Sequence, residues 1–216
     1  MIRNIIKFVV ILVVAGVVIG GGVAALYGVF KGDIERRELA IKEEAIRAVC
    51  PPGATADFDH PILVEEPDPK GGPPVKVPVY VALSAEGQAL AIIAQGEAQG
   101  YSSLVKVMVG ARPEDFAVIR VVVLAQQETP GLGATVAETR STWTLWEKLF
   151  GSPGPEQRIN AFLDQFQGKR VEEFPQVHAI TAATITSNAT KRAVEQALER
   201  IRKAAEKQRT GAGANE

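Results

Sequence analysis

The chain has 216 residues, of which 46% are hydrophobic and 23% are charged, and its formal net charge is -1. This length provides for one domain of moderate size plus appendages, and the lack of a basic excess excludes nucleic acid as an expected partner. With one cysteine, two histidines and no CxxC pair, the composition excludes an iron–sulfur cluster or a structural zinc site held by this chain alone.

An uncharged apolar segment runs from Phe8 to Phe30. As a helix it would rise about 34 Å, which is enough to cross the hydrocarbon core of a bilayer. A cleaved signal peptide is the alternative, but its apolar core is usually only about 7–15 residues long. The sequence therefore predicts an uncleaved anchor over residues 1–32. Basic residues flank the segment on both sides, so their distribution does not predict its orientation.

Residues 33–74 are predicted to form a charged helix followed by a linker. Apolar residues recur at helical spacing as far as Val49, and Pro51-Pro52-Gly53 ends the pattern. From there to residue 74 the chain is rich in proline, glycine and acidic residues. A loop is expected over this stretch, with one short apolar run at residues 62–64.

Four segments between residues 75 and 125 are predicted to form β-strands. Each contains alternating or β-branched apolar residues, and turn signals separate them. The predicted strands cover residues 76–83, 89–94, 104–109 and 116–124. The last of these is the longest apolar run and is expected at the centre of the sheet.

Helices are predicted over residues 142–150, 157–167 and 189–207, and residues 209–216 are predicted to be a disordered tail. Together the elements predict an α+β fold in which a transmembrane helix precedes one domain. That domain is expected to cover residues 75–208 and to contain an antiparallel sheet flanked by helices.

A glycine-rich turn, Glu128-Thr-Pro-Gly-Leu-Gly133, directly follows the last predicted strand. Pro130-Gly131 is a strong turn signal. Two glycines around Leu132 leave the backbone exposed and would let a flat ligand approach closely. The alternative is a plain turn at the end of a strand, and composition alone favours that alternative.

A cluster of hydroxyl residues, His178-Ala-Ile-Thr-Ala-Ala-Thr-Ile-Thr-Ser-Asn-Ala-Thr190, precedes the closing helix. Ser187 or Asn188 would serve as the N-cap, so the residues alone favour a capping region. The functional alternative is an anion site, because N–H groups at a helix start carry partial positive charge. The helix start, together with Thr186, Ser187 and Asn188, would hold a phosphate there, and a threonine hydroxyl could carry it covalently.

Both motifs, placed after the anchor, resemble those of the FMN-binding domain family. Within that family the chain is most similar to the G subunit of Rnf-type ion-translocating electron-transport complexes. The related alternative is the C subunit of the sodium-translocating NADH:quinone reductase. The resemblance covers nearly the whole chain, including the Gly100-Tyr101 step before a strand and the run Phe162-Leu-Asp-Gln-Phe-Gln-Gly-Lys169.

In this family a flavin transferase joins the phosphate of FMN to a threonine of the hydroxyl motif through a phosphoester. The resemblance implies that Thr184 is this threonine, with Thr186 as the second candidate, and that the Glu128–Gly133 turn lies against the flavin. No catalytic residue and no metal ligand is implied. The residues expected to bind covalent FMN are Thr181, Ala183, Thr184, Thr186, Ser187, Glu128, Thr129, Gly131, Leu132 and Gly133.

Two positions depart from the family's motif. The family's glycine is Ala182 here, and the acidic residue usually found before the motif is His178 here. An alanine is compatible with the motif if the backbone does not need a positive φ at that position.

The resemblance also implies a role in electron relay. The chain would carry electrons within a complex that couples ferredoxin and NAD oxidoreduction to ion translocation, and would not be a complete enzyme by itself. It would lie in the inner membrane, with its soluble domain on the periplasmic side. Its partners would be the other membrane proteins of the complex and the flavin transferase. Two alternatives are a component of the quinone-reductase type and a scaffold protein that keeps the fold without flavin.

Overall fold

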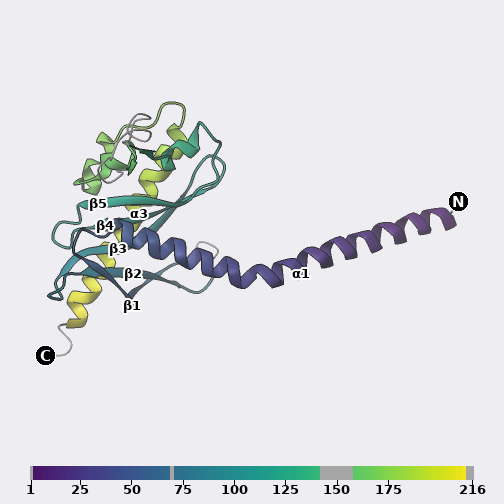
Figure 1. The fold of residues 1–216 in the computed structure, drawn as a ribbon, viewed down its shortest axis with the longest axis horizontal. Helices are drawn as coiled ribbons and strands as arrows, with labels where there is room; N and C mark the ends of the chain where they lie inside the picture. Colours follow the sequence, from purple (N-terminus) through teal and green to yellow (C-terminus); the bar gives the residue numbers. More distant parts are fainter. Residues whose placement is uncertain (1, 69–70, 142–157, 213–216) are drawn as a thin grey trace, which may run out of the picture. The chain divides into compact units, whose positions relative to one another are not determined.

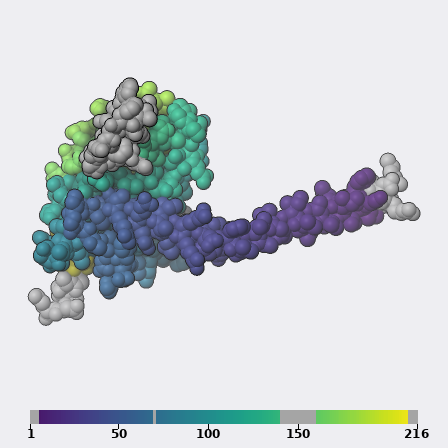
Figure 2. Space-filling view, in the orientation of Figure 1, coloured from purple at the N-terminus to yellow at the C-terminus, as the bar shows by residue number. Residues whose placement is uncertain are grey.

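One continuous helix, α1 (Ile2–Val49), contains both the predicted anchor and the predicted charged helix (Figure 1). The protein is described from a computed structural model, which covers residues 2–68, 71–141 and 158–212. The chain forms two compact units, Met1–Glu43 and Glu44–Glu216. In the first unit, residues 6–43 are exposed along the helix (Figure 2). The length and apolar composition of this helix are sufficient for it to cross a membrane.

The second unit contains a five-stranded antiparallel sheet in the order β1-β2-β3-β4-β5, so each strand pairs with its neighbours in the chain. The strands are β1 (Thr55–Glu66), β2 (Val75–Leu83), β3 (Ala89–Gln99), β4 (Leu104–Ala111) and β5 (Val118–Ala125). The predicted α+β fold with an antiparallel sheet is confirmed. Strands β2 to β5 lie where strands were predicted, although β3 extends five residues further, to Gln99.

Strand β1 corrects the prediction of a loop between residues 51 and 74. Its pairing with β2 is irregular between Asp57 and Ile62, because the intervening residues Phe58-Asp-His-Pro61 form a bulge. A bulge breaks the alternation of apolar and polar residues, and a proline is tolerated on an edge strand. The predicted domain limits at residues 32, 74 and 208 stay predictions, but the sheet begins before residue 75.

Strand β5 was predicted to be central, and this prediction is wrong, because β5 is the last strand of the sheet. Both of its faces are nevertheless covered. Val118 and Val121 belong to one core cluster, whereas Ile119 and Val122 pack against the other. A strand covered on both faces has a nearly continuous apolar sequence, which is also the pattern of a central strand.

Alternate side chains of each central strand enter two different cores. In β3, Ile92 packs in the larger core while Ile93 packs in the smaller one, because successive side chains of a strand point to opposite faces. The smaller core is closed by the last turn of α1, where Ile46 and Val49 are buried. The end of α1 therefore belongs to the folded domain.

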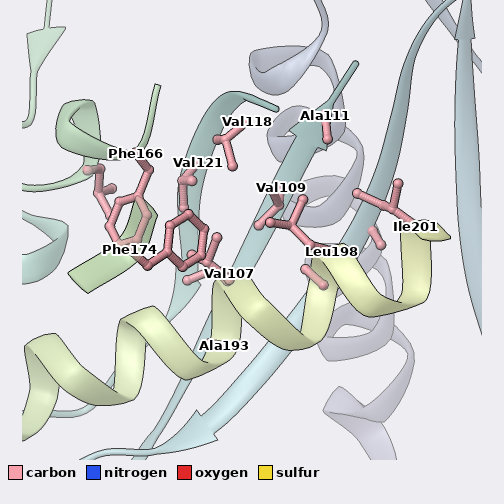
Figure 3. Close-up of a cluster of buried hydrophobic side chains, with 14 of the residues drawn as sticks. Val107, Val109, Ala111, Val118, Val121, Phe166, Phe174, Ala193, Leu198 and Ile201 are labelled. Atoms are coloured by element: carbon pink, nitrogen blue, oxygen red, sulfur yellow. The ribbon is translucent and has the colours of Figure 1, made fainter. Parts of the chain in front are cut away.

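Helix α3 (Thr184–Ala212) covers the other face of the sheet. Figure 3 shows Leu198 and Ile201 of α3 directed toward the valines of β4 and β5, with Phe166 and Phe174 at one end of the cluster. The helix lies very close to β3 at Gly96, where an added Cβ would be only 1.9 Å from the carbonyl oxygen of Ala193. Position 96 therefore requires a glycine.

A buried ion pair joins α3 to β1. Arg200 donates two hydrogen bonds to Glu66, at 2.8 and 2.6 Å, and a third, at 2.6 Å, to the carbonyl oxygen of Gln95. The side chains of Arg200 and Glu66 are only 6% and 18% exposed. This pair ties the edge strand, β3 and the final helix together.

The segment before α3 contains short elements instead of the helix predicted at 157–167. These are β7 (Arg158–Ile159), which pairs with β6 (Arg140–Ser141), and the 3₁₀ helices η2 (Leu163–Phe166) and η3 (Val171–Gln176). Asn160 interrupts the pattern, because its side-chain oxygen accepts hydrogen bonds from the N–H groups of Phe162 and Leu163. Those residues and Phe166 are buried. The helix predicted at 142–150 lies outside the described residues.

Candidate functional site

A pocket of about 370 Å³ lies between the loop after β3, the turn after β5 and the start of α3. This volume falls within the range of about 300–1,000 Å³ that is usual for ligand pockets. Apolar side chains at the pocket are unusually exposed: Tyr101 by 71%, Leu132 by 45% and Ile185 by 53%. The lining residues are Tyr101, Glu128, Thr129, Leu132, Gly133, Ala182, Ala183, Thr184, Ile185 and Thr186.

One buried carboxylate connects the three segments that form the pocket. Glu128 is 6% exposed. Its Oε1 accepts hydrogen bonds from the backbone N–H of Ser102 (3.0 Å), the backbone N–H of Ser103 (2.9 Å) and the hydroxyl of Ser103 (3.2 Å). Its Oε2 accepts the hydroxyl of Thr186 at 2.8 Å. We call Glu128, Ser102, Ser103 and Thr186 the Glu128 cluster.

The hydrogen bonds of the Glu128 cluster keep the carboxyl ionised. Burial raises the pKa of Glu128, but hydrogen bonds from Ser103, Thr186 and Ser102 stabilise the charged form and hold the pKa below its usual range. A carboxylate that accepts several hydrogen bonds is satisfied without a cation. The site therefore contains a fixed negative charge at neutral pH.

Glycines at two positions make room for this carboxylate. A Cβ added at Gly133 would lie 2.6 Å from Thr186 Oγ1 and 2.7 Å from Glu128 Oε2, and one at Gly100 would lie 2.6 Å from Glu128 Oε1. Gly133 is thus needed for packing within the site. Gly131 has a different reason for being glycine, because its φ of 75° lies in the left-handed region.

Helix α3 begins at Thr184, five residues before the predicted start at 189. Its first backbone bond runs from the N–H of Ser187 to the carbonyl of Ala183 at 2.9 Å. The predicted capping role of Ser187 or Asn188 is wrong, because Ser187 lies inside the helix and its hydroxyl accepts the N–H of Ile180 at 3.0 Å. The N–H groups of residues 184–186, in the first turn, have no hydrogen-bond acceptor within the helix.

The two candidate threonines differ in accessibility. Thr184 is exposed and lines the pocket. Thr186 is 2% exposed, and its hydroxyl donates to Glu128. Of the two hydroxyls, only that of Thr184 is both accessible from the pocket and outside the Glu128 cluster.

The loop that leads into α3 has a fixed but strained conformation. The side chain of Gln165 accepts the N–H of His178 at 2.8 Å and donates to its carbonyl at 3.3 Å. Ala182 has a φ of 63°, in the left-handed region that favours glycine. The backbone therefore needs a positive φ at the position where the sequence departs from the family's glycine.

Seven of the ten predicted site residues line the pocket, namely Glu128, Thr129, Leu132, Gly133, Ala183, Thr184 and Thr186. The other three do not: Thr181 and Gly131 are exposed outside the lining, and Ser187 is fully buried. Sequence reasoning did not select Tyr101, Ile185 or the two serines of the Glu128 cluster. The Gly100-Tyr101 step was the available signal for that loop.

Comparisons with known proteins identify the family of the chain. A model of the FMN-binding domain matches residues 100–199, a range that contains every lining residue of the pocket. The G subunit of the ion-translocating oxidoreductase complex of Pseudomonas aeruginosa (strain UCBPP-PA14) is 31% identical over 191 residues, covering 83% of this chain and 81% of that protein. The chain belongs to the family of these G subunits. The resemblance found in the sequence is thereby confirmed.

Other members of the G-subunit family match over a shorter range. The Shewanella baltica (strain OS223) protein is 34% identical over 125 residues, covering 56% of this chain and 53% of that protein. Among solved structures, Shewanella oneidensis NqrC matches with a TM-score of 0.47 and 17% identity, covering 77% of this chain and 74% of that chain.

Proposed function

We propose that this chain is a membrane-anchored flavoprotein that carries FMN on Thr184 through a phosphoester and relays electrons within an ion-translocating oxidoreductase complex. The observation that carries the proposal is the exposed hydroxyl of Thr184, at the first turn of α3, in a pocket that lies within the FMN-binding match. The family relationship supports the assignment to such a complex.

The residues of the pocket fit the two halves of FMN. Backbone N–H groups of the first turn of α3 favour a phosphate, because they carry partial positive charge and have no acceptor within the helix. The exposed apolar side chains of Tyr101, Leu132 and Ile185 provide a surface for a flat ring. Thr184 lies next to both surfaces, where it could hold the cofactor through its phosphate.

Bound FMN would supply one- and two-electron transfer, while the protein positions it and tunes its properties. The chain's own residues would bind and orient the cofactor. The Glu128 cluster fixes the turn and the helix start, and Gln165 fixes the loop before them. We propose that partner proteins of the complex deliver and remove the electrons and couple ferredoxin and NAD oxidoreduction to ion movement.

We assign membrane attachment to α1, because it contains an exposed apolar stretch long enough to cross a membrane. We propose that the folded domain lies on the periplasmic side of the inner membrane, where a covalent bond would prevent loss of the cofactor. A reporter fused to the C-terminus tests this assignment. Activity of a periplasm-specific reporter is expected, and activity of a cytoplasm-specific reporter alone would overturn it.

Mass spectrometry of the full chain, co-expressed with a flavin transferase, tests the attachment. The peptide that contains Thr184 is expected to carry the added mass of FMN phosphoryl, and Thr184→Val is expected to abolish in-gel flavin fluorescence. Thr210→Val, at an exposed position of the same helix outside the pocket, is the control and is expected to keep the fluorescence. Fluorescence that persists in Thr184→Val and disappears in Thr186→Val would move the site to Thr186.

The left-handed φ of Ala182 supports a second candidate, a scaffold protein that keeps the fold without flavin. A strained residue at the position of the family's glycine could reduce modification. The same mass measurement decides between the candidates, because an unmodified Thr184 peptide after co-expression would favour the scaffold. A sodium-translocating NADH:quinone reductase is the alternative for the surrounding complex.

A further inference from the structure

Glu128 and the partly buried Glu66 have different partners. Glu66 is paired with the guanidinium of Arg200. Glu128 accepts hydrogen bonds only from neutral groups, namely two backbone amides and two hydroxyls. Among the residues that the structure describes, no lysine, arginine or histidine forms an ion pair with Glu128. Its charge is therefore stabilised locally but not neutralised.

We propose that the Glu128 carboxylate lowers the reduction potential of the flavin in the pocket by opposing the negative charge that reduction creates. The inference rests on the proposed function. Glu128 lines the same pocket as Thr184 and Ile185, and only 6% of its surface is exposed. Solvent therefore screens its charge less than the charge of an exposed carboxylate.

The charge balance gives the direction of the effect. An uncharged oxidised ring that takes up two electrons and one proton acquires one negative charge. A fixed negative charge nearby raises the free energy of the reduced form more than that of the oxidised form. The interaction is strong where water is excluded, because the effective dielectric constant is lower than in solvent. The electrons come from the partner proteins of the complex, or from the electrode in the experiment below.

Spectroelectrochemical titration of the detergent-solubilised, flavin-loaded full chain tests the proposal. Glu128→Gln removes the charge with little change in volume and is expected to shift the midpoint potential to a more positive value. The control is Glu86→Gln, which removes an exposed carboxylate in the turn between β2 and β3. Its potential is expected to stay unchanged, because water and salt screen exposed charges.

Thr186→Val separates the charge of Glu128 from its role in holding the pocket together. This variant removes one hydrogen-bond donor and leaves the carboxylate with three. The remaining charge is less compensated, so the midpoint potential is expected to become more negative. If Glu128 only positioned the segments, both variants would loosen the same pocket and shift the potential in the same direction.

Opposite shifts in Glu128→Gln and Thr186→Val support the proposal, and shifts in one direction or no shift overturn it. If Glu128→Gln does not fold or load, Thr186→Val decides alone, and a positive or absent shift overturns the proposal. Failure of the proposed function would be seen separately. In that case the wild-type chain would carry no FMN, and no flavin potential could be measured.

Discussion

At the scale of single residues, Ala182 is the source of backbone strain in the candidate site. Its φ of 63° costs an L-residue about 1–2 kcal/mol, while glycine loses about 0.5–1 kcal/mol of backbone entropy relative to alanine. Ala182→Gly is therefore expected to stabilise the protein by roughly 0.75 kcal/mol, the difference between the midpoints of these ranges. Thermal unfolding followed by circular dichroism should show a rise in Tm of about 1–4 °C.

The neighbouring alanine provides a matched control for this substitution. Ala183 is 5% exposed, and its φ is not positive. Ala183→Gly therefore relieves no backbone strain. It is expected to lower Tm, because it adds entropy to the unfolded chain and removes a buried methyl group. Equal decreases in Tm for both variants would show that the conformation of Ala182 is not strained.

The sequence predicts Thr184 as a site residue but does not predict the side chains that surround it. Glu128 precedes Pro130-Gly131 and therefore has the sequence context of an exposed turn, although the fold buries it. Its partner Thr186 is 58 residues away in the chain, so no local pattern predicts their contact. For the same reason Gly133 suggested ligand access, whereas the structure shows that it accommodates two side chains.

At the scale of elements, the ion pair between Glu66 and Arg200 connects β1 to α3. Arg200→Met leaves the partly buried Glu66 carboxylate without its cation and is expected to lower the free energy of unfolding by less than the ~3–5 kcal/mol typical of a fully buried pair. The double variant Glu66→Gln/Arg200→Met removes both charges and is expected to lose less stability than Arg200→Met. Denaturant unfolding of the single and double variants measures the difference. A double variant no more stable than Arg200→Met would contradict this account.

The same ion pair contributes to the pH dependence of stability. Hydrogen bonding to Arg200 holds the pKa of Glu66 below its usual range. A carboxylate with a lowered pKa stabilises the fold above its unfolded pKa, about 4.3, and this contribution is lost as the pH falls through the folded pKa. Tm should therefore fall less steeply in acid for Glu66→Gln/Arg200→Met than for the unmodified chain. Parallel curves of Tm against pH for the two proteins would exclude a contribution of Glu66 to the pH dependence of stability.

Elements differed in how well their sequences predicted them. Strands β2, β3 and β4 have simple apolar patterns and were located from them. The bulge in β1 interrupts its apolar pattern with Asp59 and His60, so the sequence predicts a loop there. The sequence predicts a later start for α3 because the first turn of this helix is rich in threonine, which is typical of capping regions.

At the scale of the whole molecule, the core of the second unit begins within α1. Removal of residues 1–43 leaves Ile46 and Val49 in place, so residues 44–216 are expected to fold as a water-soluble domain. Removal of residues 1–54 takes these side chains away. Burial of each is worth about 1.5–3 kcal/mol, and the loss uncovers Ile93 and Met108.

Thermal unfolding and binding of a hydrophobic dye distinguish the two truncations. The longer chain is expected to unfold cooperatively and bind little dye, and the shorter one to unfold at a lower temperature and bind more. Equal stability of both chains would show that the last turn of α1 is dispensable for the fold. Loss of folding in the longer chain would show that the domain depends on its first unit.

The order of the pocket's segments along the chain has a consequence for biosynthesis. The pocket needs the first turn of α3, and this helix is held against the sheet by residues as late as Leu198 and Ile201. A ribosome has therefore synthesised the chain at least as far as Ile201 before α3 can pack and the pocket can close. Any reaction that requires the closed pocket must follow the packing of α3 against the sheet.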